Sequence, residues 1–204
     1  MKLVYAQPSP FVRKVLVILE EAGKSGSIEL VDGFGSPVAP SDNAMAVNPV
    51  GKIPCLVLND GTSLYDSRVV TRYLDREFNL SLYPGGDAEF TTLTLEAHAD
   101  AMMDAGVLCV YEKRCRDESI HSEDWLNAQR GKVNRALDAL EEKWIPHLQG
   151  TMDIGHIGVG CALGYMDFRV EMGGWGDWRS NRPKLAAWGE EFMQRPSMKA
   201  TVPA

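Results

Sequence analysis

The stretch NPVGKIPCLVLNDGTSLYDSRVVTRYLD, residues 48–75, carries the clearest structural pattern of the sequence. Residues 53–58 are apolar and indicate a strand, and the Asn-Asp-Gly at 59–61 is typical of a tight hairpin turn. Residues 62–65 predict the returning, antiparallel strand. A helix is expected over 66–78, because its apolar side chains recur at three- and four-residue intervals. The stretch therefore predicts a β-hairpin followed by a helix.

The residues before this hairpin predict strands that alternate with helices. Residues 2–6 indicate a buried strand, and 10–22 indicate an amphipathic helix that Gly23 ends. A second strand is expected at 27–31 and a weak helix at 42–47. The resulting order is β-α-β-α-β-β-α, with a right-handed crossover between the first two strands, which are parallel.

Beyond residue 78 the pattern becomes helical. A turn-rich linker at 79–89 contains Tyr-Pro-Gly-Gly-Asp, and helices are expected at 90–117, 123–148, 153–172 and 183–194. The third of these helices is apolar on nearly all sides, which indicates burial. Its four glycines each cost about 1 kcal/mol relative to Ala, so we expect neighbouring helices to approach closely there. The fold class is thus a small α/β domain followed by an all-α domain.

Composition excludes several classes of protein. The chain has 204 residues, of which 45% are hydrophobic and 24% charged, and its formal net charge is −7. These values are ordinary for a folded domain and argue against disorder and against a nucleic-acid partner. No apolar stretch approaches the roughly 20 residues of a membrane helix, and no signal peptide is visible. A soluble protein in the cytoplasm is expected.

The cysteines and histidines are not spaced as the ligands of a metal site usually are. The four cysteines form no C-x-x-C pair, and the four histidines form no H-x-x-x-H pair. We therefore expect no metal, and buried or incidental thiols in a reducing compartment. The cysteines are Cys55, Cys109, Cys115 and Cys161, and the histidines are His98, His121, His147 and His156.

Three stretches carry a resemblance to a known family: YAQPSPFVRKV at 5–15, the stretch at 48–75, and DIGHIGVGCALGYMDFR at 153–169. Together they resemble the cytosolic glutathione S-transferases, most closely the bacterial members with serine at the active position. The resemblance implies a thioredoxin-like N-terminal domain and an all-α C-terminal helical bundle domain. The implied boundaries are 1–78 for the glutathione-binding domain, 79–89 for the linker, and 90–204 for the helical domain contributing the second-substrate site.

Ser9 has two interpretations. From the residues alone, Ser9 followed by Pro10 is a standard helix start, and a cap is the favoured role. The resemblance implies instead that the Ser9 hydroxyl is catalytic and activates glutathione. A hydroxyl that donates to sulfur favours thiolate over thiol, so Ser9 needs no base and is not itself the nucleophile. Tyr5 and Arg13 are weaker candidates for assisting it.

The remaining glutathione contacts also follow from the resemblance. The Ile53-Pro54 bond would be cis and would present the Ile53 backbone to glutathione, whereas residues alone favour a trans proline that opens an edge strand. Asp66 and Ser67 are ordinary helix caps, yet in the family they bind the ammonium and carboxylate of the γ-glutamyl group. Phe11 would pack against the tripeptide.

The second substrate is expected beside helical residues Met102, Met103, Tyr111 and Tyr165, although each is equally an ordinary core residue at helical spacing. The resemblance implies glutathione as co-substrate, a small apolar electrophile, and a homodimer. A glutathione-dependent peroxidase or isomerase, or a non-catalytic binding or assembly module, are the alternatives.

One departure from the family pattern concerns the start of the apolar helix at 153. The family usually has Ser or Thr there with Asp three residues later, which forms a capping box. Here Asp153 would be the cap and His156 occupies the reciprocal position, with Thr151 as another candidate cap.

Overall fold

The computed structural model describes residues 1–203 and divides into two compact units. Unit 1 comprises residues 1–83 together with the segment from Pro196 onward, and unit 2 comprises residues 84–195. Sequence patterns assigned that last segment to the helical domain, whereas it packs with the N-terminal unit.

Unit 1 is built on a four-stranded mixed sheet, in the order β2-β1-β3-β4. β1 and β2 are parallel, while β3 is antiparallel to both β1 and β4, as the hairpin pattern predicts. β3 is shorter than expected from sequence because Pro54 has no N–H to give to the ladder. The strands are β1 Lys2–Tyr5, β2 Glu29–Asp32, β3 Cys55–Val57 and β4 Ser63–Leu64.

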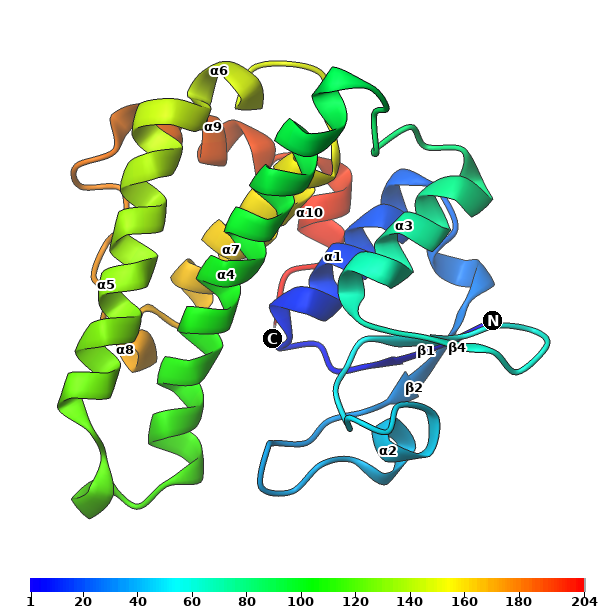
Figure 1. Cartoon of the computed structure of the whole chain (residues 1–204), viewed down its shortest axis with the longest axis horizontal. Helices are drawn as coiled ribbons and strands as arrows, with labels where there is room; N and C mark the ends of the chain where they lie inside the picture. The colour runs from blue at the N-terminus through cyan, green and yellow to red at the C-terminus, as the bar shows by residue number, and fades with distance from the viewer. Residues whose placement is uncertain (204) are drawn as a thin grey trace. The chain divides into compact units, whose positions relative to one another are not determined.

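Helices cover both faces of this sheet. Figure 1 shows α1 and α3 against one face and α2 against the other. Side chains alternate accordingly along β1, because successive residues of a strand point to opposite faces. Val4 and Cys55 pack with Ala44 of α2 in one buried cluster. The helices are α1 Pro10–Glu21, the short 3₁₀ turn η1 Ser25–Ser27, α2 Asp42–Val47 and α3 Ser67–Phe78.

A last short helix, α10 (Pro196–Ala200), completes unit 1 against α1. Arg13 of α1 donates from Nη2 to the carbonyl of Met198 at 3.0 Å, and Ser197 donates to the Glu21 carboxylate at 2.5 Å. Arg13 is 4% exposed. Its guanidinium therefore holds two distant segments of the chain together.

Unit 2 is entirely helical in its regular structure. The expected helix over 123–148 is interrupted, because Pro146 lacks an N–H and would clash with the carbonyl four residues earlier. A π-helical turn accommodates the interruption. The elements are α4 Asp87–Cys115, η2 Glu118–Ile120, α5 Glu123–Ala139, η3 Leu140–Trp144, α6 Ile145–Leu148, α7 Ile154–Phe168, α8 Val170–Gly173 and α9 Pro183–Phe192.

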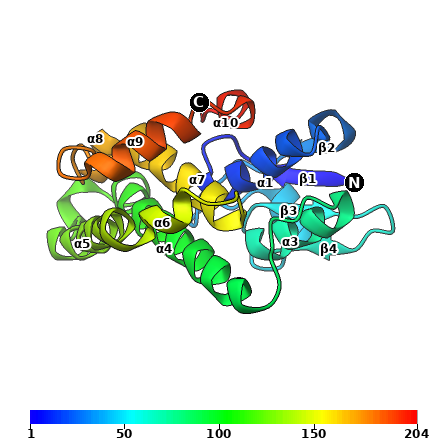
Figure 2. The same ribbon diagram turned by 90° about the horizontal axis from the view of Figure 1, so that it is seen from above.

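Helix α7 is the centre of unit 2, lying between the α4/α5 pair and α9 (Figure 2). This position explains its apolar sequence. Glycines permit the close contact with α4: a Cβ on Gly155 would lie 2.8 Å from Leu95, and one on Gly106 would lie 2.9 Å from Met166. Within residues 1–203, no helix combines the length and apolarity that crossing a membrane requires.

Candidate functional site

Strand register brings the sequence-predicted residues of unit 1 to one end of the sheet. Val4, near the end of β1, pairs with Cys55 at the start of β3, and Leu56 pairs with Leu64 at the end of β4. The loop that follows β1, the residues that precede β3 and the residues that follow β4 must therefore lie at the same end. These segments carry Ser9, Ile53-Pro54 and Asp66-Ser67.

Ser9 is the N-cap of α1. Its backbone is extended, with φ −79° and ψ 122°, and its Oγ accepts a hydrogen bond from the Val12 amide at 3.4 Å. The side chain is half-buried. Capping uses the hydroxyl oxygen as an acceptor, and the hydroxyl proton has no acceptor among residues 1–203. Ser9 can therefore cap its helix and donate to a ligand at the same time.

Two helix starts converge at this end of the sheet. α1 follows β1, α3 follows β4, and the two helices pack against each other on the same face of the sheet (Figure 1). Each helix start carries unpaired backbone N–H groups and about half a positive charge. The region therefore favours an anionic group, such as a carboxylate or a thiolate.

Asp66 and Ser67 place a negatively charged acceptor and a hydroxyl donor side by side at the start of α3. Asp66 caps the helix by accepting from the Arg68 amide at 3.0 Å, and its side chain is 60% exposed. Ser67, the first helical residue, is 4% exposed, and its hydroxyl has no partner in the described part of the chain. The Tyr65–Asp66 peptide is cis. The amides of Arg68, Val69 and Val70 all donate to Asp66. The exposed Asp66 carboxylate thus lies beside the unused Ser67 hydroxyl.

The segment before β3 is shaped by a cis peptide between Ile53 and Pro54. Ile53 lies outside the strand ladder, whose register begins at Cys55. Gly33, after β2, permits a tight approach there, because a Cβ would lie 3.0 Å from Ile53 and 2.7 Å from Val4. No neighbouring strand pairs with the Ile53 backbone in the register of the sheet, so its N–H and C=O can pair with an extended ligand.

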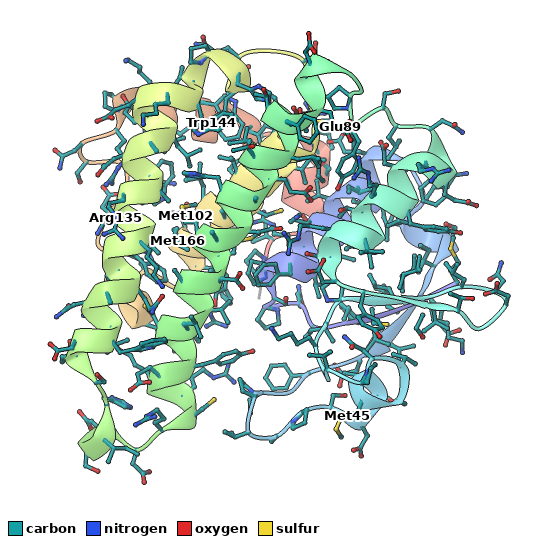
Figure 3. The ribbon with its side chains drawn as sticks, viewed as in Figure 1. Met45, Glu89, Met102, Arg135, Trp144 and Met166 are labelled. Carbon is teal, nitrogen blue, oxygen red and sulfur yellow. The ribbon has the colours of Figure 1, made fainter. Side chains whose placement is uncertain are left out.

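The other sequence-predicted residues fall into different environments. Phe11 is half-buried in the first turn of α1. Met102 and Met103 are 1% and 0% exposed, and Figure 3 labels Met102 and Met166 within unit 2, where both are buried. Tyr165 is 4% exposed on α7, while Tyr111 on α4 is half-buried.

Two arginines near these tyrosines were missed by the sequence analysis. Burial raises the pKa of Tyr165 to about 12, and the nearby Arg169 and Arg114 cations oppose that shift. Burial also raises the pKa of Tyr111, again against Arg114. The spacing of Tyr165 and Arg169, four residues apart on one helix, was the available signal.

The start of α7 holds a different polar cluster. Asp153 caps the helix by accepting from the His156 amide at 3.2 Å, and its other oxygen accepts from Thr92 of α4 at 2.5 Å. His147 Nε2 lies 2.8 Å from the carboxylate, and His156 Nδ1 lies 2.7 Å from the carboxylate and 3.2 Å from the Asp153 amide nitrogen, as in a capping box. His156 thus occupies the reciprocal position that looked like a departure in the sequence.

Charge in this cluster is stabilised by hydrogen bonding. Burial raises the pKa of Asp153, but the hydrogen bonds from His156 and Thr92 outweigh burial and hold the pKa well below its usual range. One potential ligand atom from each of His147, Asp153 and His156 lies within 4.8 Å of the others, so these are the side chains that could hold a metal ion. Both carboxylate oxygens are already engaged, Oδ1 by His156 and Oδ2 by Thr92 and His147.

Known proteins resemble both parts of the chain. The family model for the N-terminal domain of glutathione S-transferase matches residues 8–77, and that for the C-terminal domain matches residues 123–190. The uncharacterized GST-like protein YibF of Escherichia coli (strain K12) is 34% identical over 207 residues, covering 100% of this chain and 98% of YibF.

Solved structures give the same result. A glutathione transferase family member from Pseudomonas fluorescens Pf-5, with bound glutathione, is 45% identical with a TM-score of 0.93, and the match covers 100% of this chain and 98% of that one. A second structure from that organism, with bound S-(propanoic acid)-glutathione, is 46% identical with a TM-score of 0.91 and coverages of 100% and 99%. The chain therefore belongs to the glutathione S-transferase family.

Proposed function

We propose that this chain binds glutathione at the end of the unit 1 sheet and uses Ser9 to stabilise the glutathione thiolate. The observation that carries the proposal is the convergence there of the Ser9 hydroxyl, the α1 and α3 helix starts, and the Asp66-Ser67 pair. The relative from Pseudomonas fluorescens with bound glutathione supports the assignment of ligand.

Each part of glutathione has a chemical match. Its α-carboxylate is recognised by the hydroxyl and amide of Ser67, and its ammonium by the exposed Asp66 carboxylate. The cysteinyl backbone pairs with the Ile53 backbone in the manner of an added strand. Phe11 contacts the apolar part of the tripeptide.

Ser9 acts on the sulfur. A free thiol has a pKa near 8.5, so little of it is ionised at neutral pH. Donation from the Ser9 hydroxyl and the positive end of α1 stabilise the thiolate, and the thiol proton leaves to solvent. The thiolate then attacks an electrophilic carbon. The relative with bound S-(propanoic acid)-glutathione, a thioether of glutathione, supports carbon–sulfur bond formation as the reaction.

The thiolate absorbance of bound glutathione, followed against pH, tests this function. In the wild-type protein the thiol should titrate about one pH unit or more below the free value, because one unit corresponds to about 1.4 kcal/mol. Ser9→Ala should bind glutathione yet return the thiol pKa toward the free value, and Ser9→Thr, which keeps the hydroxyl, should retain most of the shift.

Three outcomes separate the alternatives. A shift lost only in Ser9→Ala supports thiolate activation by Ser9. Binding without any shift in the wild-type protein rules out activation and favours a carrier or a different use of glutathione. Absence of binding rules out the glutathione site and favours a non-catalytic assembly module.

The assembly and location of the protein are further parts of the proposal. A homodimer in the cytoplasm is proposed from family membership, and the cysteines, none of which is disulfide-bonded within residues 1–203, agree with a reducing compartment. Light scattering checks the dimer, since a mass of 22.5 kDa at all concentrations would contradict it.

A further inference from the structure

Helices α6 and α7 bring two histidines to one carboxylate. His147 lies on α6, Asp153 is the N-cap of α7, and His156 belongs to the first turn of α7. His147 Nε2 lies 2.8 Å from Asp153 Oδ2, and His156 Nδ1 lies 2.7 Å from Oδ1. One potential ligand atom from each side chain lies within 4.8 Å of the other two. Two imidazoles and a carboxylate, which are common zinc ligands, thus share one small region.

Hydrogen bonds alone do not satisfy the His156 ring. The capping box requires Nδ1 to accept from the Asp153 amide at 3.2 Å, so Nδ1 carries a lone pair there instead of a proton. That lone pair lies 2.7 Å from Oδ1, which carries only lone pairs of its own. In the other neutral tautomer Nδ1 donates to Oδ1, and the amide loses this acceptor. In both tautomers Nε2 is buried without a partner within residues 1–203. Each tautomer therefore leaves a buried polar contact unsatisfied.

A metal ion between these atoms replaces the contact between lone pairs by two attractive ones. Ligand atoms of a zinc ion lie about 2.1 Å from it, and so about 3–3.5 Å from one another. The two nitrogen–oxygen separations of 2.7 and 2.8 Å are close to that range. The Nδ1 contact given up is the longer one, to the Asp153 amide. Thr92 and the His156 amide can still donate to the carboxylate, because each oxygen has two lone pairs.

The surroundings of the cluster favour a cation. The side chains of Asp153 and His156 are 7% and 3% exposed, so little water screens the carboxylate charge. Within residues 1–203, only the two histidines lie at ion-pair distance from this carboxylate, and no lysine or arginine competes for it. The His147 side chain is 24% exposed, which gives an ion access from solvent and lets the ring adjust.

We infer that His147, Asp153 and His156 form a binding site for a divalent metal ion of the zinc class. Imidazole nitrogens select zinc and its neighbours over Mg²⁺ and Ca²⁺, which prefer oxygen ligands. Three protein ligands leave a fourth position for water, on the side where His147 is exposed. The ion connects α6 to the start of α7 and stabilises the segment between them.

This site was not expected from the sequence. Residues 147 and 156 are nine positions apart and lie on different helices, so no metal-binding motif describes them. The sequence analysis therefore predicted no metal, and the contacts of Asp153 are the reason to revise that prediction. The inference lies wholly within unit 2 and does not depend on the proposed glutathione site.

Metal titration of the reduced, metal-free protein tests the site. Calorimetry should show one Zn²⁺ bound per chain and no binding of Mg²⁺ under the same conditions. Co²⁺, a spectroscopic probe for zinc sites, should bind without the near-ultraviolet charge-transfer band that a thiolate ligand produces. It should also quench part of the tryptophan fluorescence, because the Trp144 ring, labelled in Figure 3, lies 5.8 Å from that of His147, and the Trp188 ring lies 6.3 Å from that of His156. A thiolate band, or no Zn²⁺ binding, overturns the inference.

One matched pair of variants identifies the ligands. His147→Gln keeps a side-chain donor for Asp153 but removes the imidazole, and should weaken Zn²⁺ binding by about tenfold or more. His121→Gln is the control, because His121 is also a half-buried histidine of unit 2 but contacts the Arg116 carbonyl instead of the cluster. It should leave the affinity unchanged. Equal affinities of wild type and His147→Gln overturn the inference.

Nuclear magnetic resonance of the wild-type protein covers the case in which His147→Gln does not fold. The ring ¹⁵N signals of His98 and His121 are assigned by their loss in the corresponding Gln variants, which leaves the signals of two rings for the cluster. Zn²⁺ should shift the signals of these two rings and not those of His98 or His121. No shift of the cluster signals with Zn²⁺ overturns the inference, whatever the result of the glutathione titration.

Discussion

One helix in each unit begins with an aspartate cap, but the two aspartates differ in their exposure to solvent and in the number of their partners. Asp66 and Asp153 are both aspartate N-caps, of α3 and α7 respectively. The side chain of Asp66 is 60% exposed, whereas that of Asp153 is 7% exposed and engaged by Thr92 and two histidines. The two Asp66 oxygens accept from Arg68 alone, from its amide at 3.0 Å and its guanidinium at 3.3 Å, and keep further acceptor capacity on the exposed side. Asp153, which is engaged by three residues, has little. A capping carboxylate can accept hydrogen bonds from a ligand when its neighbours leave it both accessible and incompletely satisfied.

Replacing each aspartate cap by alanine should give the largest difference in the free energy of unfolding. Asp153→Ala should lower the free energy of unfolding by about 3–5 kcal/mol, because it leaves buried polar partners without their carboxylate. Asp66→Ala should cost only about 1 kcal/mol, the usual price of an exposed cap. Urea unfolding of both variants checks the prediction, and equal losses would abolish the distinction between the caps.

Acid should weaken the start of α7 in a defined pH window. Because the folded-state pKa of Asp153 lies below its unfolded value, the stabilisation is fully present above about pH 4 and is lost as the pH falls toward the folded value. The stability difference between wild type and Asp153→Ala should therefore shrink below pH 4, by about 1.4 kcal/mol per pH unit. Urea unfolding at pH 5 and pH 3 measures it, and a difference that grew at pH 3 would contradict the sign.

Two threonines of α4 allow a buried hydrogen bond to Asp153 to be compared with an exposed one on the same helix. Thr92 is buried and donates to Asp153, while Thr94 is exposed and donates to the Phe90 carbonyl. Thr92→Val should cost about 1–3 kcal/mol through the lost donor to a buried carboxylate, and Thr94→Val much less. Thermal unfolding of the pair provides the measurement. Similar losses would mean that the network is not what stabilises this end of α7.

Charge removal at Asp66 should affect ligand binding rather than folding. Asp66→Asn keeps the cap, since Asn caps as well as Asp, but removes the charge proposed to hold the glutathione ammonium. Glutathione affinity should fall by about tenfold, or about 1.4 kcal/mol, with little change in stability. Asp60→Asn, in the hairpin turn of the same unit, is the matched control for charge. Calorimetric titration showing equal affinities for both variants would remove Asp66 from the site.

Local pattern was sufficient for most elements of the fold. The hairpin, the start of α1 at Ser9-Pro10 and the helix that follows Asp66 are set by nearby residues, so they could be predicted. The break between α5 and α6 was recognisable only in part, because a proline can end a helix or be absorbed by a π turn. The placement of α10 against α1 depends on contacts more than 180 residues apart in sequence, which no local pattern contains.

The partners of the polar residues in unit 2 also could not be predicted from local sequence pattern. Asp167 is two residues from Arg169 in sequence, yet its carboxylate is bound by Arg179 at 2.6 and 2.7 Å. Which arginine binds this carboxylate is decided by tertiary structure, so sequence spacing alone could not identify Arg179. His156 was judged by its departure from a family pattern, whereas its ring fulfils the same geometric role at the start of α7.

The return of the chain to α1 has a consequence for protein engineering. A fragment that stops at Tyr83 would lack the carbonyl that binds Arg13 and the hydroxyl that binds Glu21, and would leave both charged groups of α1 without these partners. Chimeras with a relative, joined once near residue 84, would combine α1 of one parent with α10 of the other. A two-crossover exchange that keeps residues 1–83 and 196–203 from the same parent preserves the matched pair.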